Sequence, residues 1–370
     1  MARLGDVVKI SPSTAPLVGE QHWLLNLDMV EQQTGQIIAY NYVAADELDG
    51  SIIQFDTDAV LYSKLRPNLN KVVLPERAGF ATSEMLPLVP DSSVLKREYL
   101  TCYLRSDSFV LWAVSKTSGA KMPRLGSKEL LNKEIPLPSI AEQNSIVQQF
   151  TKVDNLISLR KQQLAKLDEL VKSRFVELFG GKGYPEDTLL NLCNIIDYRG
   201  KTPEKVEYGL PFITAKNVKM HQMNLEPREY ISKETYDKVM VRGFPKEGDV
   251  VFTTEAPLGN VCRIPHFDTE FYIGQRIVTM QTEKLEPIYL EYALSSDNFK
   301  MKYMGKSSGS TVTGIRVRLL EQLTIPVPPI DIQTQFATFV EQTDKSKLSI
   351  QQSIDQLETL KKSLMQQYFG

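Results

Sequence analysis

Residues 179–183 read FGGKG, a pattern that could hold a cofactor. Its F-x-G-x-G spacing is that of adenosylmethionine-dependent methyltransferases. Such glycines need a preceding β-strand, so that the backbone can approach the cofactor closely. Here a long helical pattern precedes them, and the same pair recurs at Phe369-Gly370. We therefore interpret Gly180 as a helix stop followed by a linker. No N-P-P-[FY] or D-P-P-[FY] tetrapeptide, which would hold a target amine, occurs in the sequence.

Other catalytic patterns are incomplete. GFPKEGDV, beginning at Gly243, has the glycine spacing of a phosphate-binding loop but carries Asp249 where a lysine must neutralise phosphate. The three cysteines and three histidines of the sequence lack metal-ligand spacing. The sequence therefore predicts a chain that binds and does not catalyse, without a metal site.

Three stretches contain several cations and no acidic residue. They are AVLYSKLRPNLNKVVLP, SKTSGAKMPRLGSK and the segment 298–320. Lys and Arg neutralise phosphates, while Asn, Gln, Ser and Arg can hydrogen-bond base edges. Lys116 and Lys306 align when the sequence is shifted by 190 residues, so a basic loop recurs. We therefore favour nucleic-acid contact over a merely solvated loop. Asn70 and Asn260 could equally be turn residues.

The candidate DNA-binding residues are Lys64, Arg66, Asn68, Asn70, Lys71, Lys116, Thr117, Ser118, Lys121, Arg124, Lys216, Asn217, Thr253, Thr254, Gln275, Arg276, Lys306, Ser307, Ser308, Ser310, Thr311 and Arg316.

Length and composition limit the kind of protein to which these residues belong. At 370 residues, with 42% apolar and 24% charged residues, the chain can form two globular domains. A net charge of −2 does not exclude DNA, because only the contacting face must be basic. The sequence shows neither a signal peptide nor a membrane-spanning run, and its scattered cysteines are typical of a reducing compartment. We expect a cytoplasmic protein that makes no use of a membrane.

A repeat defines the organisation. Residues 134–180 align with 324–370 without a gap, and both begin with an extended Ile-Pro-x-Pro and end with Phe-Gly. Between these ends, apolar residues recur every three or four positions over about five heptads, which predicts two long helices that pair as an antiparallel coiled coil. Each would be about 55 Å long. Two unrelated helices, each packed on its own domain, are the alternative. The seam positions, which we also expect to dock partners, are Phe150, Ile157, Leu164, Leu167, Val171, Leu178, Val340, Ile354, Leu357 and Leu364.

The domains between the helices are predicted to be related α+β domains. Weaker matches extend upstream, such as Tyr99-Leu100 with Tyr289-Leu290. The predicted parts are recognition domain 1 (1–133), a first helical spacer (134–180), recognition domain 2 (181–323) and a second helical spacer (324–370). Runs such as AVLYSKL, KVVLP, DVVFT and RIVTMQT are expected strands, and segments 97–106 and 287–295 are expected helices.

With these parts in place, the chain resembles the specificity subunit of type I restriction–modification systems. The resemblance rests on IPLPSIAEQNSIVQQFTKVDNLI, LDELVKSRFVELFG, IPVPPIDIQTQFATFV and LKKSLMQQYFG, with LYSKLRPNLNKV and GDVVFTTEAPLGNV in the domains. It covers essentially the whole chain, and its helical parts are the more specific.

The resemblance implies two target-recognition domains, each reading half of a split, asymmetric DNA sequence, with pseudo-twofold symmetry and helices that fix the gap. It implies a non-catalytic subunit that docks two copies of an adenine methyltransferase and allows assembly with an ATP-driven restriction and translocation subunit. Adenosylmethionine, ATP and Mg²⁺ would then be bound by those partners.

Two other functions fit parts of the pattern. One is a two-headed adaptor that binds proteins through domains on a coiled-coil strut, and the other is a DNA-modifying enzyme with diverged motifs. Steep salt dependence would distinguish DNA binding from the adaptor, and adenosylmethionine binding by the isolated chain would reveal the enzyme.

Overall fold

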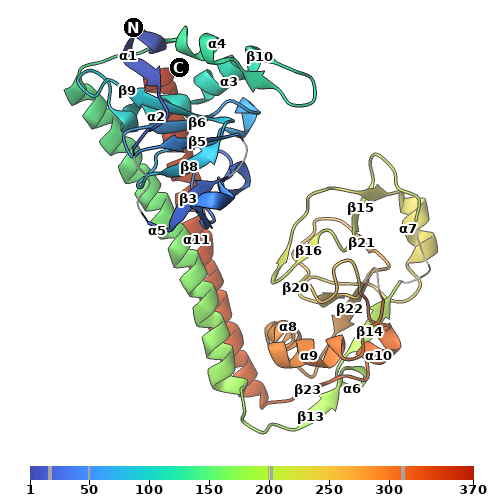
Figure 1. Ribbon diagram of the computed structural model, residues 1–370. Coiled ribbons are helices and arrows are strands. Elements are labelled where there is room, and N and C mark those ends of the chain that lie inside the picture. The colour runs from blue at the N-terminus through green and yellow to red at the C-terminus, as the bar shows by residue number, and fades with distance from the viewer. Residues whose placement is uncertain (16–18, 49–50, 199, 201–202, 310–312) are drawn as a thin grey trace. The chain divides into compact units, whose positions relative to one another are not determined.

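The computed structural model describes residues 1–15, 19–48, 51–198, 200, 203–309 and 313–370. The chain forms two compact units, each with its own cores (Figure 1). The first unit contains Met1–Gln162 with Ile350–Gly370, and the second contains Gln163–Ser349. Both boundaries fall inside long helices, so each unit contains parts of both helical repeats. The predicted division into two domains and two helical spacers does not coincide with these compact units. It remains a prediction about which parts recognise a target and which parts act as spacers.

Two four-stranded sheets form the first unit. The first sheet is antiparallel, in the order β2 (Val8–Ile10), β9 (Met85–Pro90), β6 (Val60–Ser63) and β7 (Val72–Val73). The second has the order β4 (Asn41–Ala44), β3 (Gln21–Leu25), β8 (Gly79–Thr82) and β5 (Ile52–Phe55), with β3 and β8 parallel. Strand β6 alternates its side chains between the cores: Val60 and Tyr62 pack in one, Leu61 in the other.

Short elements complete the first unit. Helices α2 (Arg97–Leu104) and α3 (Asp107–Ser115) contribute to the same core as the first sheet. The remaining elements are β1 (Ala2–Arg3), α1 (Leu4–Val7), η1 (Leu27–Met29), η2 (Ala45–Glu47), η3 (Pro67–Leu69), β10 (Thr117–Ser118), β11 (Arg124–Leu125), α4 (Ser127–Leu131) and β12 (Glu134–Ile135). Strand β1 pairs with β12, and β10 forms a hairpin with β11.

The second unit repeats this plan, which confirms the predicted duplication. Its antiparallel sheet has the order β14 (Asn194–Asp197), β22 (Ile277–Gln281), β19 (Val250–Thr253) and β20 (Val261–Arg263). A three-stranded sheet follows, in the order β18 (Tyr230–Ile231), β15 (Leu210–Ile213) and β21 (Tyr272–Ile273).

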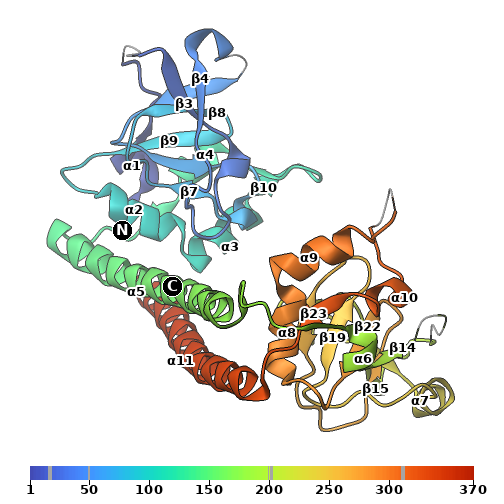
Figure 2. The same ribbon diagram turned by 90° about the horizontal axis from the view of Figure 1, so that it is seen from below.

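The helices of the second unit include α8 (Pro287–Ser295) and α9 (Asp297–Met304), which share a core with β19 and β22 (Figure 2). The other elements are β13 (Glu186–Thr188), α6 (Leu189–Leu192), β16 (Val218–Lys219), β17 (Gln222–Met223), α7 (Lys233–Val239), α10 (Val317–Leu320) and β23 (Thr324–Pro326). Helix α8 has the bounds predicted from the sequence, and the four predicted strands contain β6, β7, β19 and β22.

The two long helices are α5 (Ile140–Phe179) and α11 (Ile330–Phe369), each of 40 residues. Helix α5 starts with a capping box, in which the Ser139 amide donates to the Glu142 carboxylate at 2.9 Å and the Glu142 amide donates to the Ser139 hydroxyl at 3.3 Å. Neither helix contains Pro or Gly, and each stops where Gly180 or Gly370 follows. Both predicted helices are thereby confirmed.

The helices pair antiparallel within each unit. Asp154 and Lys361 form an ion pair at 2.6 Å in the first unit, and Asp168 and Lys347 form one at 2.6 Å in the second. Each lysine of α11 pairs with a carboxylate of the facing helix α5. Among the seam positions, four are buried and six half-buried. The buried ones are Phe150, Val171, Val340 and Ile354; the half-buried ones are Ile157, Leu164, Leu167, Leu178, Leu357 and Leu364.

One glutamine clamps the start of each long helix to its domain. In the first unit, Gln143 accepts a hydrogen bond from the Lys96 amide at 2.9 Å and donates to the carbonyls of Val94 and Pro138. In the second, Gln333 accepts from the Glu286 amide at 2.9 Å and donates to the Pro328 carbonyl at 2.7 Å. Both glutamine side chains are buried.

A tyrosine reinforces each clamp. The Tyr99 hydroxyl donates to the Pro136 carbonyl at 3.2 Å, and the Tyr289 hydroxyl donates to the Pro326 carbonyl at 2.8 Å. The residues shared between the repeats thus join each domain to its helix. No helix in the described part of the chain is long and apolar enough to cross a bilayer.

Candidate nucleic-acid interface

In the second unit, the loops at the ends of β19 and β22 meet the segment before α10. The Thr254 amide donates to the Arg276 carbonyl, and the Ile315 amide donates to the Thr254 carbonyl, each at 2.9 Å. Ser308 and Gly314 exchange two backbone hydrogen bonds of 3.0 Å. These segments line a hollow of about 350 Å³ that includes Gln275 and Arg316. The predicted residues Thr254, Gln275, Ser308 and Arg316, which span 62 positions of the sequence, therefore line one hollow.

A neighbouring, mainly apolar hollow of about 290 Å³ adjoins the first. Gln275 lines both hollows, and Arg276, Lys205 and Lys216 line the second. The ammonium of Lys205 pairs with Glu229 at 2.7 Å, whereas Lys216 lies 4.0 Å from it. Lys216 is therefore the more available cation for a phosphate.

The first unit places equivalent segments together. The Arg66 amide donates to the Pro123 carbonyl at 2.8 Å, and the Leu125 amide donates to the Lys64 carbonyl at 2.9 Å. These bonds join the loop after β6 to the β10–β11 hairpin, which carries Lys116 to Arg124. Arg66 has φ +49°, and its counterpart in the second unit, Ala256, has φ +50°. A left-handed conformation is uncommon in non-glycine residues, and it occurs here at the same place in both units.

Each loop cluster contains one arginine–carboxylate pair. In the first unit, Nε and Nη2 of Arg124 lie 3.0–3.1 Å from the carboxylate of Glu84. In the second, Nε of Arg276 lies 2.9 Å from Oε1 of Glu255. The Glu84 pair raises the pKa of the Arg124 guanidinium through hydrogen bonds and charge attraction, so this arginine stays charged. Both arginines are partly exposed.

Most predicted contact residues are accessible. The exposed ones are Arg66, Asn68, Lys116, Ser118, Lys121, Lys216, Arg276, Lys306, Ser308 and Arg316. The half-buried ones are Lys64, Lys71, Thr117, Arg124, Gln275 and Ser307. Lys71 directs its ammonium to the Leu27 carbonyl at 2.5 Å. Ser310 and Thr311 lie outside the described residues.

Four predicted residues are buried, which argues against direct contact with DNA. They are Asn70, Asn217, Thr253 and Thr254. Asn70 is left-handed, with φ +50°, and donates to the Arg105 carbonyl at 3.0 Å, which fits the turn role left open from the sequence. Asn217 accepts from the Thr214 amide at 2.9 Å and donates to the Asn224 carbonyl at 2.9 Å. The hydroxyls of Thr253 and Thr254 donate within the same loops.

Sequence reasoning missed Glu84 and Glu255. The search selected stretches without acidic residues, and these two glutamates lie outside such stretches. An acidic residue next to the end of a core strand, opposite an arginine in a distant loop, would have been the signal. Finding this signal in the sequence would have required knowing which strands are neighbours in the sheet.

The cysteines are unsuited to nucleophilic chemistry. Burial raises the pKa of Cys102 to about 11 and those of Cys193 and Cys262 to about 12. These thiols are therefore protonated at neutral pH. The described residues contain no cluster of His, Cys, Asp and Glu that could hold a metal ion.

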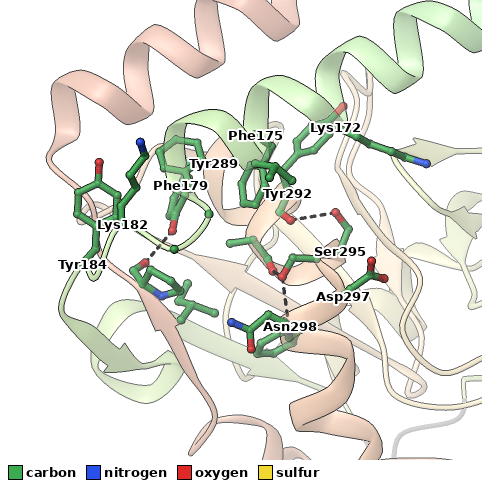
Figure 3. A pocket seen from close by; sticks show the side chains of 18 of the residues that line it. Lys172, Phe175, Phe179, Lys182, Tyr184, Tyr289, Tyr292, Ser295, Asp297 and Asn298 are labelled. Atoms are coloured by element: carbon green, nitrogen blue, oxygen red, sulfur yellow. Dashed lines mark hydrogen bonds between the residues drawn. The ribbon is translucent and has the colours of Figure 1, made fainter.

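A different kind of hollow, of about 620 Å³, lies at the C-terminal end of α5 in the second unit (Figure 3). Phe175, Phe179, Tyr289 and Tyr292 line it with aromatic rings. The rings of Phe179 and Tyr289 are 4.7 Å apart, so the predicted helix stop also anchors the helix end in the domain. Its aromatic lining distinguishes this hollow from the polar loop cluster.

Comparison with known proteins gives consistent matches. Residues 38–169 and 186–359 match the family described as the type I restriction modification DNA specificity domain. The type I restriction enzyme MjaVIII specificity subunit of Methanocaldococcus jannaschii is 26% identical over 329 residues, which cover 80% of this chain and 75% of that protein.

Two solved structures share the fold along the chain. One, from a study of assembly and conformational transition in the type I restriction–modification system, has a TM-score of 0.64 at 20% identity and covers 100% of this chain and 96% of the other. The type I restriction–modification S subunit from M. genitalium has a TM-score of 0.58 at 14% identity, with 100% and 95% coverage.

Proposed function

The chain belongs to the type I restriction–modification DNA specificity family, and we propose that its two repeated domains each read one half of a split, asymmetric DNA sequence. As a specificity subunit it recognises DNA and is itself non-catalytic. The proposal extends this to residues: exposed members of the two loop clusters contact the duplex, Lys and Arg at phosphates, and Asn, Gln, Ser and Arg at base edges.

The observation that carries the proposal is the recurrence of one loop cluster on one scaffold with different side chains. Both clusters join the end of a central strand, β6 or β19, to the segment that follows the second domain helix. Lys116 and Lys306 occupy equivalent, exposed places, whereas Arg124 is replaced by Gly314. A shared phosphate-binding frame with different reading residues suits two half-sites of different sequence.

We propose that α5 and α11 set the number of unread base pairs between the half-sites. A helix of 40 residues is about 60 Å long, or about 18 base-pair steps. The interhelical ion pairs of Lys347 and Lys361 support one fixed register of the two helices. Reading two half-sites through one strut would raise affinity without one large interface.

The same helices are the proposed docking sites for two copies of an adenine methyltransferase. Leu170 and Leu360 are equivalent in the repeats, and their exposed fractions are 49% and 47%. Two matching apolar positions suit two identical partners. Adenosylmethionine would be bound by these partners, and ATP and Mg²⁺ by an additional restriction subunit. We infer a cytoplasmic location, where chromosomal DNA and these partners would be available.

The decisive experiment is a methylome. The chain would be co-expressed with its adenine methyltransferase in a host free of adenine methylation, and modified adenines mapped by single-molecule sequencing. A split motif with a fixed gap, absent when this chain is omitted, is the expected result. An active methyltransferase that produces no motif with the chain present would overturn the proposal and favour a protein-binding adaptor.

A further inference from the structure

We propose that Arg124 and Arg276 each read a guanine, one in each half-site, and that Glu84 and Glu255 are positioning residues for them. This inference rests on the proposed DNA-reading function and deepens it. It assigns one G·C pair of the target to each domain.

In the second unit, Glu255 contacts the Nε edge of Arg276. Oε1 of Glu255 lies 2.9 Å from Nε of Arg276, and the side chains are 44% and 54% exposed. Two Nη groups complete the guanidinium of Arg276. These two groups form the outer fork of the guanidinium, which matches the O6 and N7 acceptors of guanine. Arg276 also lines one of the two hollows of the loop cluster.

In the first unit, Glu84 holds the side edge of Arg124. Oε1 of Glu84 accepts from both Nε and Nη2, at 3.1 and 3.0 Å. Nε also donates to Oε2 at 3.1 Å, and the fourth contact is a long one, from Nη1 to the Met122 carbonyl at 3.5 Å. A guanidinium held along this edge keeps the hydrogens of its outer fork directed away from the carboxylate. Both arginines can therefore offer the same pair of donors.

The two pairs share one equivalent position in the two domains. In the antiparallel sheets, Val60 pairs with Leu88, and the equivalent Val250 pairs with Met280. Glu84 lies four residues before Leu88, and Arg276 lies four residues before Met280, so these two positions are equivalent. Likewise, Leu65 forms an isolated antiparallel β-bridge with Arg124 in the first unit, and Glu255 forms one with Gly314 in the second. Glu84 and Arg276 thus occupy one equivalent position with opposite charge, while their partners Arg124 and Glu255 lie on two segments that pair with each other in both units.

The recurrence of an ion pair at this position favours a functional role over chance. An exposed ion pair contributes little to folding stability, so stability gives weak reason for one to recur at this place. A carboxylate near DNA also repels phosphates, which makes it unfavourable on a surface that only binds the backbone. Restricting an arginine before binding is the use that explains both observations, because a preoriented fork loses less freedom on contacting a base.

Two substitutions in each domain test the assignment in the complete chain with its methyltransferase. Arg276→Lys keeps the charge and removes the fork, and Glu255→Gln keeps the shape and removes the positioning charge. Arg124→Lys and Glu84→Gln do the same in the first unit. Arg228→Lys and Glu226→Gln are matched controls, because Nε of Arg228 lies 2.9 Å from Oε1 of Glu226 and neither residue lines the two hollows of the loop cluster.

The readouts are the methylated motif and the Kd for duplexes substituted at each motif position, at one salt concentration. For Arg276→Lys we expect one G·C position in one half-site to become degenerate, with discrimination there falling about ten- to a hundredfold. Arg124→Lys should affect one position of the other half-site. The glutamine variants should relax the same positions less, and the controls should leave the motif unchanged. Thermal unfolding verifies that each variant is folded.

The outcomes separate this inference from the function on which it rests. If the wild-type complex yields no split motif, the proposed function fails. If it yields one and the lysine variants leave every position intact, or weaken all duplexes equally, the arginines are phosphate contacts and the inference is overturned. Degeneracy from both arginines within one half-site would refute the assignment of one guanine to each domain.

Discussion

Replacing Gln143 by Met should loosen the first recognition domain from its helix. The buried Gln143 amide group makes three hydrogen bonds to backbone groups, with the Lys96 amide and the Val94 and Pro138 carbonyls. Methionine has a similar shape but makes none of these bonds, so the backbone groups lose their partner. At about 1 kcal/mol for each bond, the first unit should lose about 3 kcal/mol of its free energy of unfolding. For a unit of this size, that corresponds to about 6–12 °C in Tm.

The chain contains its own probe for this unit. Trp23 and Trp112 are its only tryptophans, and both lie in the first unit. Thermal unfolding followed by tryptophan fluorescence therefore reports on the first unit selectively. The matched control is Gln148→Met, an exposed position of the same helix, which should shift Tm by less than about 2 °C. Gln333→Met should move this transition far less than Gln143→Met, because its bonds lie in the second unit.

Comparing the Tm values of Gln143→Met and Gln148→Met tests whether Gln143 fastens the helix to its domain. If Gln143→Met lowers the fluorescence Tm no more than Gln148→Met, the glutamine does not fasten the helix. The shared Gln would then have to be explained by a role outside folding.

Three further expectations concern DNA and partner binding. Deleting one heptad from α5 and the facing heptad from α11 shortens the strut by about 10 Å, so the methylated motif should lose about three base pairs of gap; altered half-site bases would contradict the ruler. Leu170→Glu and Leu360→Glu should each remove one methyltransferase copy, measured by native mass spectrometry, without lowering Tm; two copies retained by the double variant would exclude this docking face. Replacing Lys116 and Lys121 together by Gln should reduce the slope of log K against log salt by about two, measured by fluorescence anisotropy, with the motif intact; an unchanged slope would remove them from the interface.

The helices and the repeat could be predicted because their signals are local. Apolar spacing of three and four, the absence of Pro and Gly, and the Phe-Gly ends determine α5 and α11 within one stretch of sequence. The core strands β6, β7, β19 and β22 were recognisable for the same reason. The second sheet of each domain was not, because its strands are short and joined across long separations, as in the parallel pair of β3 and β8.

The candidate site was predicted only in part, because burial depends on folding. Asn70 and Asn217 have the same polar groups as exposed asparagines, but their amides satisfy backbone groups in the interior. The ion pairs of Glu84 and Glu255 join residues 40 and 21 positions from their arginines, so no local pattern contains them. Cation-rich loops could be found from composition, whereas the orientation of their side chains could not.

The clamps at Gln143 and Gln333 also bear on how new specificities arise. Both glutamines bond to main-chain atoms, and Tyr99 and Tyr289 do the same. Substitutions on the recognition surface therefore leave the hydrogen bonds between domain and helix unchanged. A domain from a relative that keeps the tyrosine and the proline-marked strand end would fit the same strut. Recombination at these joints could replace one half of the recognised sequence in a single genetic step and leave the partner complex untouched.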